Sequence, residues 1–165
     1  MNGEKLNRSG ATITRIVSGG QTGVDRGALD AAADLGLARG GWCPKGRRAE
    51  DGVIPAQYEL IETESTRYDV RTLRNILDSD GTLVFCRATP QGGTALTVRL
   101  ARQYARPCWI IDLDQPIDFA ALDAWAQRHE VRVLNVAGPR ESNQPGIAIR
   151  VQATMVHWLQ GERAN

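Results

Sequence analysis

The stretch TITRIVSGGQTGVDRGALDAAADLGL, residues 12–37, joins a short apolar run to an alanine-rich segment through a glycine turn. The apolar run at 13–17 reads as a strand that the glycines end. From 22 to 37 the apolar residues recur at three- and four-residue intervals, which predicts a helix with one buried face. Thr22 and Asp25 have the spacing of a capping box at the helix start. A strand, a glycine turn and a helix in this order are typical of an α/β domain.

The rest of the chain continues this alternation of strands and helices. Near-continuous apolar runs such as GTLVFCR predict buried strands, and segments with helical periodicity predict the helices between them. The pattern therefore predicts an α/β fold with a parallel sheet covered on both faces. We expect one domain over residues 12–161, after a frayed or disordered tail at 1–11. The expected strands cover 40–43, 58–64, 81–87, 107–113 and 131–138, and the expected helices cover 67–79, 92–105, 117–130 and 145–159.

Length and composition indicate a globular protein and argue against several classes. The 165 residues are 42% hydrophobic and 24% charged, and the net charge is +1. A dedicated nucleic-acid binder would show a basic excess, so nucleic acid is not an expected partner. No apolar stretch is long enough to cross a membrane, and the polar start is unlike a signal peptide, so we expect a cytoplasmic protein with no membrane partner. Three widely spaced cysteines argue against a disulfide framework or a zinc site.

Four polar loops follow predicted strands, at 18–25, 43–48, 87–94 and 138–143. Ligands of α/β sheets bind at the carboxyl ends of the strands, so we expect these loops to meet at one edge. The first loop precedes a helix, whose free amides and partial positive charge favour an anion such as phosphate. It has neither the lysine of a P-loop nor the G-x-G-x-x-G pattern, and a plain capped turn is the alternative. Its candidate ligand-binding residues are Gly19, Gly20, Gln21, Thr22, Gly23 and Asp25.

The loop at 87–94 is a second glycine turn before a helix, and its glycine pair would let a ligand approach the backbone closely. The loop at 43–48 supplies the cations that the first loop lacks. These cations either contact a phosphate or form a solvated charge run, with Trp42 in the core. The candidate ligand-binding residues of the two loops are Gln91, Gly92, Gly93, Thr94, Lys45, Arg47 and Arg48.

The fourth loop, GPRESN, precedes the last predicted helix. Ser142 or Asn143 is expected to cap that helix. Arg140 and Glu141 either reach the ligand or pair with each other. The candidate ligand-binding residues of this loop are Arg140, Glu141 and Ser142.

The sequence shows no metal site and no catalytic Ser-His-Asp arrangement. His129 stands at a predicted helix end and His157 within the last predicted helix, so neither is expected near the site. Cys43 is the one thiol at the predicted edge, and an inert core residue is its simpler interpretation.

Five phrases of the chain, in order, resemble one protein family. They are SGGQTGVDRGALD, GWCPKGRRAEDG, RNILDSDGTLVF, QGGTALT and NVAGPRES, within residues 13–160. Proteins with these phrases are named molybdenum carriers, and they are similar to the YpsA-related branch of the SLOG superfamily. The resemblance implies a Rossmann-like, doubly wound fold, a nucleotide or molybdenum-cofactor ligand, and a homo-oligomer. The carrier name comes from similarity to a protein that binds molybdenum cofactor, a pterin carrying phosphate and metal.

More distantly, residues 71–97 resemble the LOG phosphoribohydrolases, which release cytokinin bases from nucleotide monophosphates. Arg71 precedes Ser79-Asp80 by the spacing found in those enzymes, and Gly92-Gly93-Thr94 corresponds to their glycine loop. Their glutamate, three residues after the threonine, is replaced here by Thr97. This replacement weighs against hydrolysis, because N-glycosidic cleavage in that group needs a carboxylate. For an enzyme of this kind the candidate catalytic residues are Arg71, Asp25 and Glu141.

Two functions therefore stay open. The first is a binding protein for a phosphate-bearing nucleotide or pterin, in which the glycine loops hold the phosphate and the 45–48 cations close over it. Asp25 would then accept a hydrogen bond from the ribose or pterin. The second is a nucleotide N-glycosidase that uses Arg71 with a carboxylate. A DNA-processing partner is disfavoured by the balanced net charge.

Overall fold

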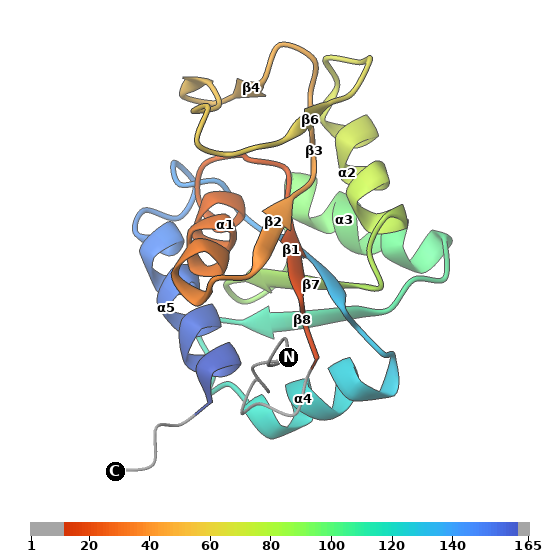
Figure 1. Cartoon of the computed structure of the whole chain (residues 1–165), viewed down its shortest axis with the longest axis vertical. Coiled ribbons are helices and arrows are strands. Elements are labelled where there is room, and N and C mark those ends of the chain that lie inside the picture. The colour runs from red at the N-terminus through yellow and green to blue at the C-terminus, as the bar shows by residue number, and fades with distance from the viewer. Residues whose placement is uncertain (1–11, 162–165) are drawn as a thin grey trace, which may run out of the picture.

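Five parallel strands form the central sheet of the computed structural model, which describes residues 12–161 (Figure 1). The strands lie in the order β2-β1-β9-β7-β8, and every neighbouring pair is parallel. The interior strand β7 is buried along its whole length, as its apolar run predicts. The α/β fold is thus confirmed, whereas the predicted tail at 1–11 lies outside the described residues. The bounds are β1 (Arg15–Val17), β2 (Ala38–Gly40), β7 (Gly81–Cys86), β8 (Cys108–Asp112) and β9 (Val133–Ala137).

The strand order is that of a Rossmann-like sheet with a changed starting point. Counted along the chain, the five strands lie in the order second, first, fifth, third, fourth. When counting begins at β9, the same order becomes third, second, first, fourth, fifth, which is the order of doubly wound nucleotide-binding folds. In such a sheet the ligand crevice lies where the strand order reverses. Here that point falls between β9 and β7.

Helices cover both faces of the sheet (Figure 1). On one face, α1, α4 and α5 share a hydrophobic cluster with the strands. On the other face, α2 and α3 pack together. A connection whose next strand lies nearer to the β2 edge places its helix on the first face, and one whose next strand lies nearer to the β8 edge places its helix on the second. This arrangement is the one that right-handed crossovers between parallel strands produce. The bounds are α1 (Val24–Leu35), α2 (Tyr68–Leu77), α3 (Gly92–Gln103), α4 (Phe119–Arg128) and α5 (Ile147–Gln160).

Residues 41–67, here called the upper segment, stand above the carboxyl edge of the sheet (Figure 1). The predicted strand at 40–43 is wrong as one element, because Gly41, with a φ of 127°, separates two strands. Residues 38–40 extend the main sheet, whereas 42–43 pair in parallel within the upper segment. The strand predicted at 58–64 shrinks to two residues. The upper segment contains β3 (Trp42–Cys43), β4 (Arg48–Ala49), β5 (Gly52–Val53) and β6 (Ile61–Glu62), with β3 pairing β6 and β4 pairing β5.

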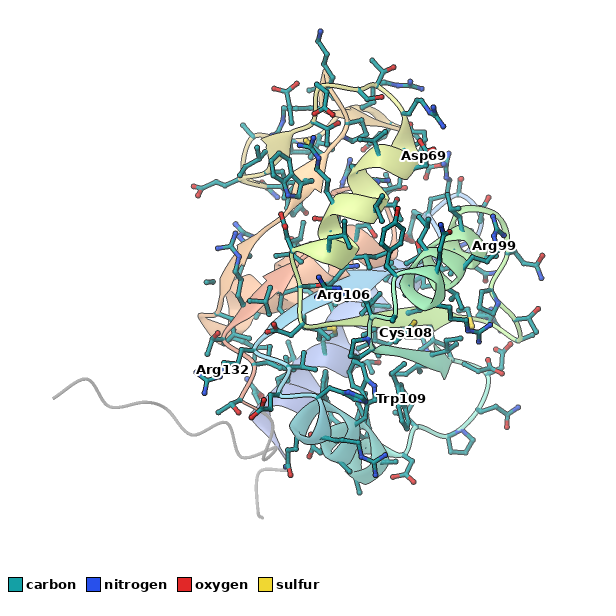
Figure 2. The ribbon with its side chains drawn as sticks, turned by 90° about the vertical axis from the view of Figure 1, so that its right-hand side faces the viewer. Asp69, Arg99, Arg106, Cys108, Trp109 and Arg132 are labelled. Carbon is teal, nitrogen blue, oxygen red and sulfur yellow. The ribbon has the colours of Figure 1, made fainter. Side chains whose placement is uncertain are left out.

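The edge strand β8 places Cys108 and Trp109 between α3 and α4 (Figure 2). Trp109 packs beneath the sheet against Trp125 of α4, with ring centroids 6.0 Å apart. Trp158 of α5 donates a hydrogen bond to Asp123 of α4 at 2.6 Å, which ties these two helices together. These contacts join α4 to β8 and to α5 on one face of the sheet. Among residues 12–161, no helix is long and apolar enough to cross a membrane.

Candidate functional site

One pocket of about 610 Å³ opens at the carboxyl edge, where β9 and β7 meet. Its volume is in the range of small-molecule sites, roughly 300–1,000 Å³. α2 and the N-terminus of α3 form two walls, and the loops after β1 and β9 complete it. The reversal of strand order thus coincides with the cavity. The predicted site residues that line it are Gly19, Gln21, Asp25, Arg71, Gln91, Gly92, Gly93, Thr94, Arg140 and Ser142.

Asp25 is a buried carboxyl group in the pocket wall, at the first turn of α1. Its Oδ2 accepts a hydrogen bond from the backbone amide of Gln21 at 3.1 Å. Burial raises the pKa of Asp25 above its usual value, and the positive charge of Arg71 offsets part of that rise. The predicted capping box is wrong, because α1 begins without a side-chain cap and the Thr22 hydroxyl donates instead to Glu50 of the upper segment.

The side chain of Gln21 is held in one orientation at the pocket. Its Oε1 accepts from the backbone amides of Thr22 at 3.1 Å and Glu50 at 2.9 Å. These two bonds fix which end of the amide is the oxygen. Within residues 12–161, Gln21 Nε2 is the buried side-chain nitrogen that has no hydrogen-bond partner. An unpaired buried donor costs about 1–3 kcal/mol, so the site gains if a ligand supplies an acceptor.

Arg71 brings a buried positive charge from α2 to the glycine turn. The residue is 8% exposed, and its Nη1 donates to the carbonyl oxygen of Gly19 at 2.6 Å. A Cβ at position 19 would lie 2.2 Å from that Nη1, so only glycine admits the guanidinium here. Gly19 therefore contributes to the pocket by leaving room for the guanidinium of Arg71.

The N-terminus of α3 faces the same pocket. The amides of Thr94 and Ala95 donate to the carbonyl of Gln91, at 3.0 and 3.2 Å. Among the hydrogen bonds of the described residues, the amides of Gly92 and Gly93 have no acceptor. Both glycines are exposed, and a Cβ on either would meet nothing within 4 Å, so the surroundings of this turn are open. Two free donors at a helix N-terminus can bind an anion.

Three guanidinium groups surround the ring of Tyr68, a residue for which the sequence suggested no role. The Cζ atoms of Arg48, Arg71 and Arg140 lie 5.1, 5.3 and 5.8 Å from the ring centroid. Distances within about 6 Å are typical of cation–π contacts. Tyr68 precedes Arg71 by three residues, and its place on the same face of the predicted helix was the available signal. We call these four residues the Tyr68 cluster.

Three predicted residues of the first loop pack against other loops and do not line the pocket. Gly20 has a φ of 79°, and a Cβ there would meet Leu60 of the upper segment at 2.5 Å. Gly23 has a φ of 82°, and a Cβ there would meet the carbonyl of Pro139 at 2.4 Å. The hydroxyl of Thr22 is engaged by Glu50. These residues therefore permit close loop packing.

The cations of the 43–48 loop do not act together. Lys45 is exposed and is not part of the pocket lining. Arg47 is turned inward, where its Nη2 donates to the carbonyls of Pro55 and Tyr58, at 3.0 and 2.7 Å. These carbonyls lie in irregular backbone and need donors, which explains why Arg47 is not free for a ligand. Arg48 alone joins the pocket region, through Tyr68.

Glu50, which the sequence did not single out, connects three loops. Its carboxylate accepts hydrogen bonds from the hydroxyls of Thr22 and Ser142 and from the backbone amide of Ser142. Its Oε2 lies 3.8 Å from Nη1 of Arg140. The hydrogen bonds from Ser142 and Thr22 hold the pKa of Glu50 below its usual value. Such long-range contacts leave no local sequence signal.

The last loop caps α5 differently from the prediction. Neither Ser142 nor Asn143 is the cap, since Gly146 occupies that position. The carboxylate of Glu141 instead accepts from the amides of Gly146 and Ala148. A carboxylate at a helix N-terminus is stabilised by the helix dipole. Glu141 is therefore occupied in holding α5.

The thiols and histidines contribute no recognisable chemistry to the site. Burial raises the pKa of Cys43 and Cys86, and raises that of Cys108 to about 11, which disfavours the reactive thiolates. His129 ends α4 and His157 lies within α5. Within the described part of the chain, no three His, Cys, Asp or Glu side chains are grouped to hold a metal ion.

Comparison with known proteins gives two matches of different kinds. The model of the circularly permutated YpsA SLOG family matches residues 16–159. The crystal structure of a protein named "Putative molybdenum carrier protein", from Syntrophus aciditrophicus SB, superposes with a TM-score of 0.84. It is 43% identical, over 89% of this chain and 96% of that one. No curated protein matches the chain. The permuted strand order and the family match agree, and the chain belongs to the circularly permuted YpsA family of the SLOG superfamily.

Proposed function

We propose that the protein binds a small phosphate-bearing ligand in the pocket at the β9–β7 junction. One observation carries the proposal: the free amides of α3 and the buried guanidinium of Arg71 line the same cavity. Amides at a helix N-terminus and a guanidinium both bind phosphate oxygens favourably. Gly92 and Gly93 leave the space that a phosphate needs.

The rest of the pocket suits a neutral polar group of the ligand. Gln21 offers a buried N–H donor, and Asp25 offers a buried carboxyl group. A ribose and a pterin both present donors and acceptors that such a pair can satisfy. Both a nucleotide and a molybdenum-cofactor-like pterin would therefore fit. The name of the similar structure supports the pterin, so we propose a carrier of that cofactor as the specific function.

The residues fit the organic part of such a cofactor. Within residues 12–161 no cluster of metal ligands is present, so the phosphate and the ring would carry the recognition. The cofactor would be a cargo, with its metal chemistry unused while it is carried. Arg71 and the α3 amides would hold the phosphate, while Gln21 and Asp25 would orient the ring.

Isothermal titration with AMP, GMP, CMP and molybdopterin tests the proposal. We expect saturable binding of at least one of them to the wild type and loss of that binding in Arg71→Ala. The control is Arg99→Ala, which removes an exposed arginine of α3 that does not line the pocket (Figure 2). Mass spectrometry of the freshly purified protein would identify a ligand that co-purifies. Failure of all four ligands to bind the wild type would refute the proposal.

A second candidate function is hydrolysis of a nucleotide N-glycosidic bond. The observation in its favour is that Arg71 and the carboxyl group of Asp25 lie in one pocket and interact electrostatically. Two observations weigh against it. Thr97 uses its hydroxyl within α3, donating to Gly93 at 3.1 Å, and Glu141 is engaged in capping α5. Asp25 is thus the remaining carboxylate among the candidates.

Release of free base from AMP, CMP and NAD decides between the two functions. An enzyme should release base at a rate that Asp25→Asn abolishes while ligand binding persists. A binding protein should release none above the rate without protein. Thr97→Glu restores the carboxylate of the LOG pattern, so gain of hydrolysis in that variant alone would show that the wild type lacks the catalytic group.

A further inference from the structure

Positive charge extends from the interior of the pocket to its mouth. Arg71 is 8% exposed, the side chain of Arg140 is 37% exposed, and Arg48 is exposed. The ring of Tyr68 lies within 5.1–5.8 Å of all three guanidinium groups. The three arginines come from β4, α2 and the loop after β9, so the fold has gathered them from distant parts of the chain.

Little negative charge offsets this cluster. Arg48 and Arg71 donate to backbone carbonyls, which carry no net charge. Arg140 has a carboxylate neighbour in Glu50, at 3.8 Å, but that carboxylate is already engaged by two hydroxyls and an amide. Asp25 faces Arg71, yet its burial favours the neutral acid. Guanidinium groups brought together without matching carboxylates repel one another, and an anionic ligand removes that repulsion.

We propose that Arg48, Arg140 and Tyr68 form a second anion subsite at the pocket mouth. The inference rests on the proposed function, in which the first phosphoryl group lies at α3 and Arg71. A ligand with two linked phosphoryl groups reaches both subsites, whereas a monophosphate reaches one. The protein therefore prefers a diphosphate, such as a nucleoside diphosphate or a pterin joined through a diphosphate. The planar guanidinium groups suit bidentate contact with phosphoryl oxygens, and the ring limits their freedom.

Titration of AMP, ADP, GMP and GDP into the full chain, without added metal, tests the inference. We expect each diphosphate to bind the wild type about tenfold more tightly than its monophosphate, which corresponds to about 1.4 kcal/mol. In the double variant Arg48→Ala, Arg140→Ala, the ratio of diphosphate to monophosphate affinity should fall to about one. A control double variant, Arg99→Ala, Arg128→Ala, removes two exposed charges from α3 and α4 and should keep the wild-type ratio.

The ratio separates this inference from the proposed function. Monophosphate binding with no advantage for the diphosphates would refute the second subsite and leave the first intact. A diphosphate advantage that survives in Arg48→Ala, Arg140→Ala would also refute it. Absence of binding by all four nucleotides would refute the preference for nucleoside diphosphates, and the proposed function itself is refuted if molybdopterin also fails to bind. The lysine variant Arg48→Lys, Arg140→Lys keeps the charge, so it should retain part of the ratio if the loss in the alanine variant is electrostatic.

Discussion

The substitution Gly19→Ala adds one methyl group and tests how Arg71 is held. Gly19 lies outside the left-handed region, so alanine fits its backbone without strain. The new Cβ would lie 2.2 Å from Nη1 of Arg71 and 2.6 Å from its Cζ, whereas ordinary contacts begin near 3.4 Å. The guanidinium must move away, and its 2.6 Å hydrogen bond to the carbonyl of residue 19 is lost. No charge is removed from the protein.

The expected cost follows from two opposing terms. Loss of a buried hydrogen bond from a charged donor costs about 1.5–3 kcal/mol. Replacing glycine by alanine at a compatible position returns about 0.4–1 kcal/mol through the unfolded state. We therefore expect Gly19→Ala to lower the free energy of unfolding by about 1–2 kcal/mol. For a domain of this size the Tm should fall by about 2–8 °C.

A double-mutant cycle with Arg71→Ala, followed by urea unfolding, isolates the mechanism. If the methyl group acts only through the guanidinium, Gly19→Ala should cost nothing in the Arg71→Ala background and should even stabilise it slightly. Nucleotide affinity should fall in each single variant and fall little further in the double variant. Equal destabilisation in both backgrounds would show that Gly19 is required for another reason, and the assigned role of Arg71 at the turn would be wrong.

Three further substitutions probe the other parts of the site. Gly93→Ala should raise the free energy of unfolding by about 0.5–1 kcal/mol, since alanine is favoured over glycine within a helix. The same variant should weaken nucleotide binding, because its methyl group occupies open space beside the N-terminus of α3. Equal nucleotide affinity in the variant and the wild type would contradict phosphate binding there. Asp25→Asn should stabilise the protein at neutral pH. The pKa of Asp25 is raised in the folded protein, so the wild type loses stability as the pH rises above the ordinary value of 3.8. Urea unfolding should therefore show a higher free energy of unfolding for the variant at pH 7 and not at pH 4. Glu50→Gln should lower the free energy of unfolding at pH 7 by about 1 kcal/mol, because a neutral amide accepts weaker hydrogen bonds than a carboxylate. The difference in free energy between variant and wild type should vanish as acid protonates the wild-type carboxylate, whose pKa is lowered. A difference that persists in acid would contradict the assignment of this effect to the charged carboxylate.

The fold was predictable because its signals are local. Each buried strand carries a continuous apolar run, as β7 does, and each helix shows its period in a dozen residues. The sheet order was not predictable, since parallel strands give no sign of their neighbours in the sequence. The division at Gly41 was also hidden, because it depends on a close approach of Gly41 to the backbone of Ser18 and to the side chain of Asn75, which are distant from it in the sequence.

The lining of the candidate site was predictable where one loop acts alone. Two glycines at the start of a helix, Gly92 and Gly93, suffice to predict free amides, and the structure places both at the pocket. Residues that act through distant partners could not be assigned. In the sequence Arg47 resembles a surface cation, but in the structure its guanidinium donates to backbone carbonyls of the irregular segment 54–58. Glu50 reads as one charge in a polar loop, yet it joins the loops after β1 and β9.

The permuted strand order explains why the first loop lacks the features of a phosphate-binding turn. In doubly wound folds the glycine-rich phosphate loop follows the strand that is numbered first in the order third, second, first, fourth, fifth. Here that strand is β9, and the loop after it contains Gly138, Pro139 and Arg140. The turn at 18–23 follows the second strand of that order, so it need not supply a lysine or a G-x-G-x-x-G pattern. Its glycines instead admit Arg71 and the neighbouring loops.

The same order explains how the site tolerates the changed connectivity. In the unpermuted arrangement α5 would lead directly into β1, and the chain would begin at β9. The end of α5 and the start of β1 both lie at the amino edge of the sheet, opposite the pocket (Figure 1). A break there leaves every loop of the carboxyl edge continuous. The crevice between β9 and β7 therefore keeps its helix N-terminus, its buried arginine and its position at the strand-order reversal, and ligand binding should depend on these features irrespective of where the chain begins.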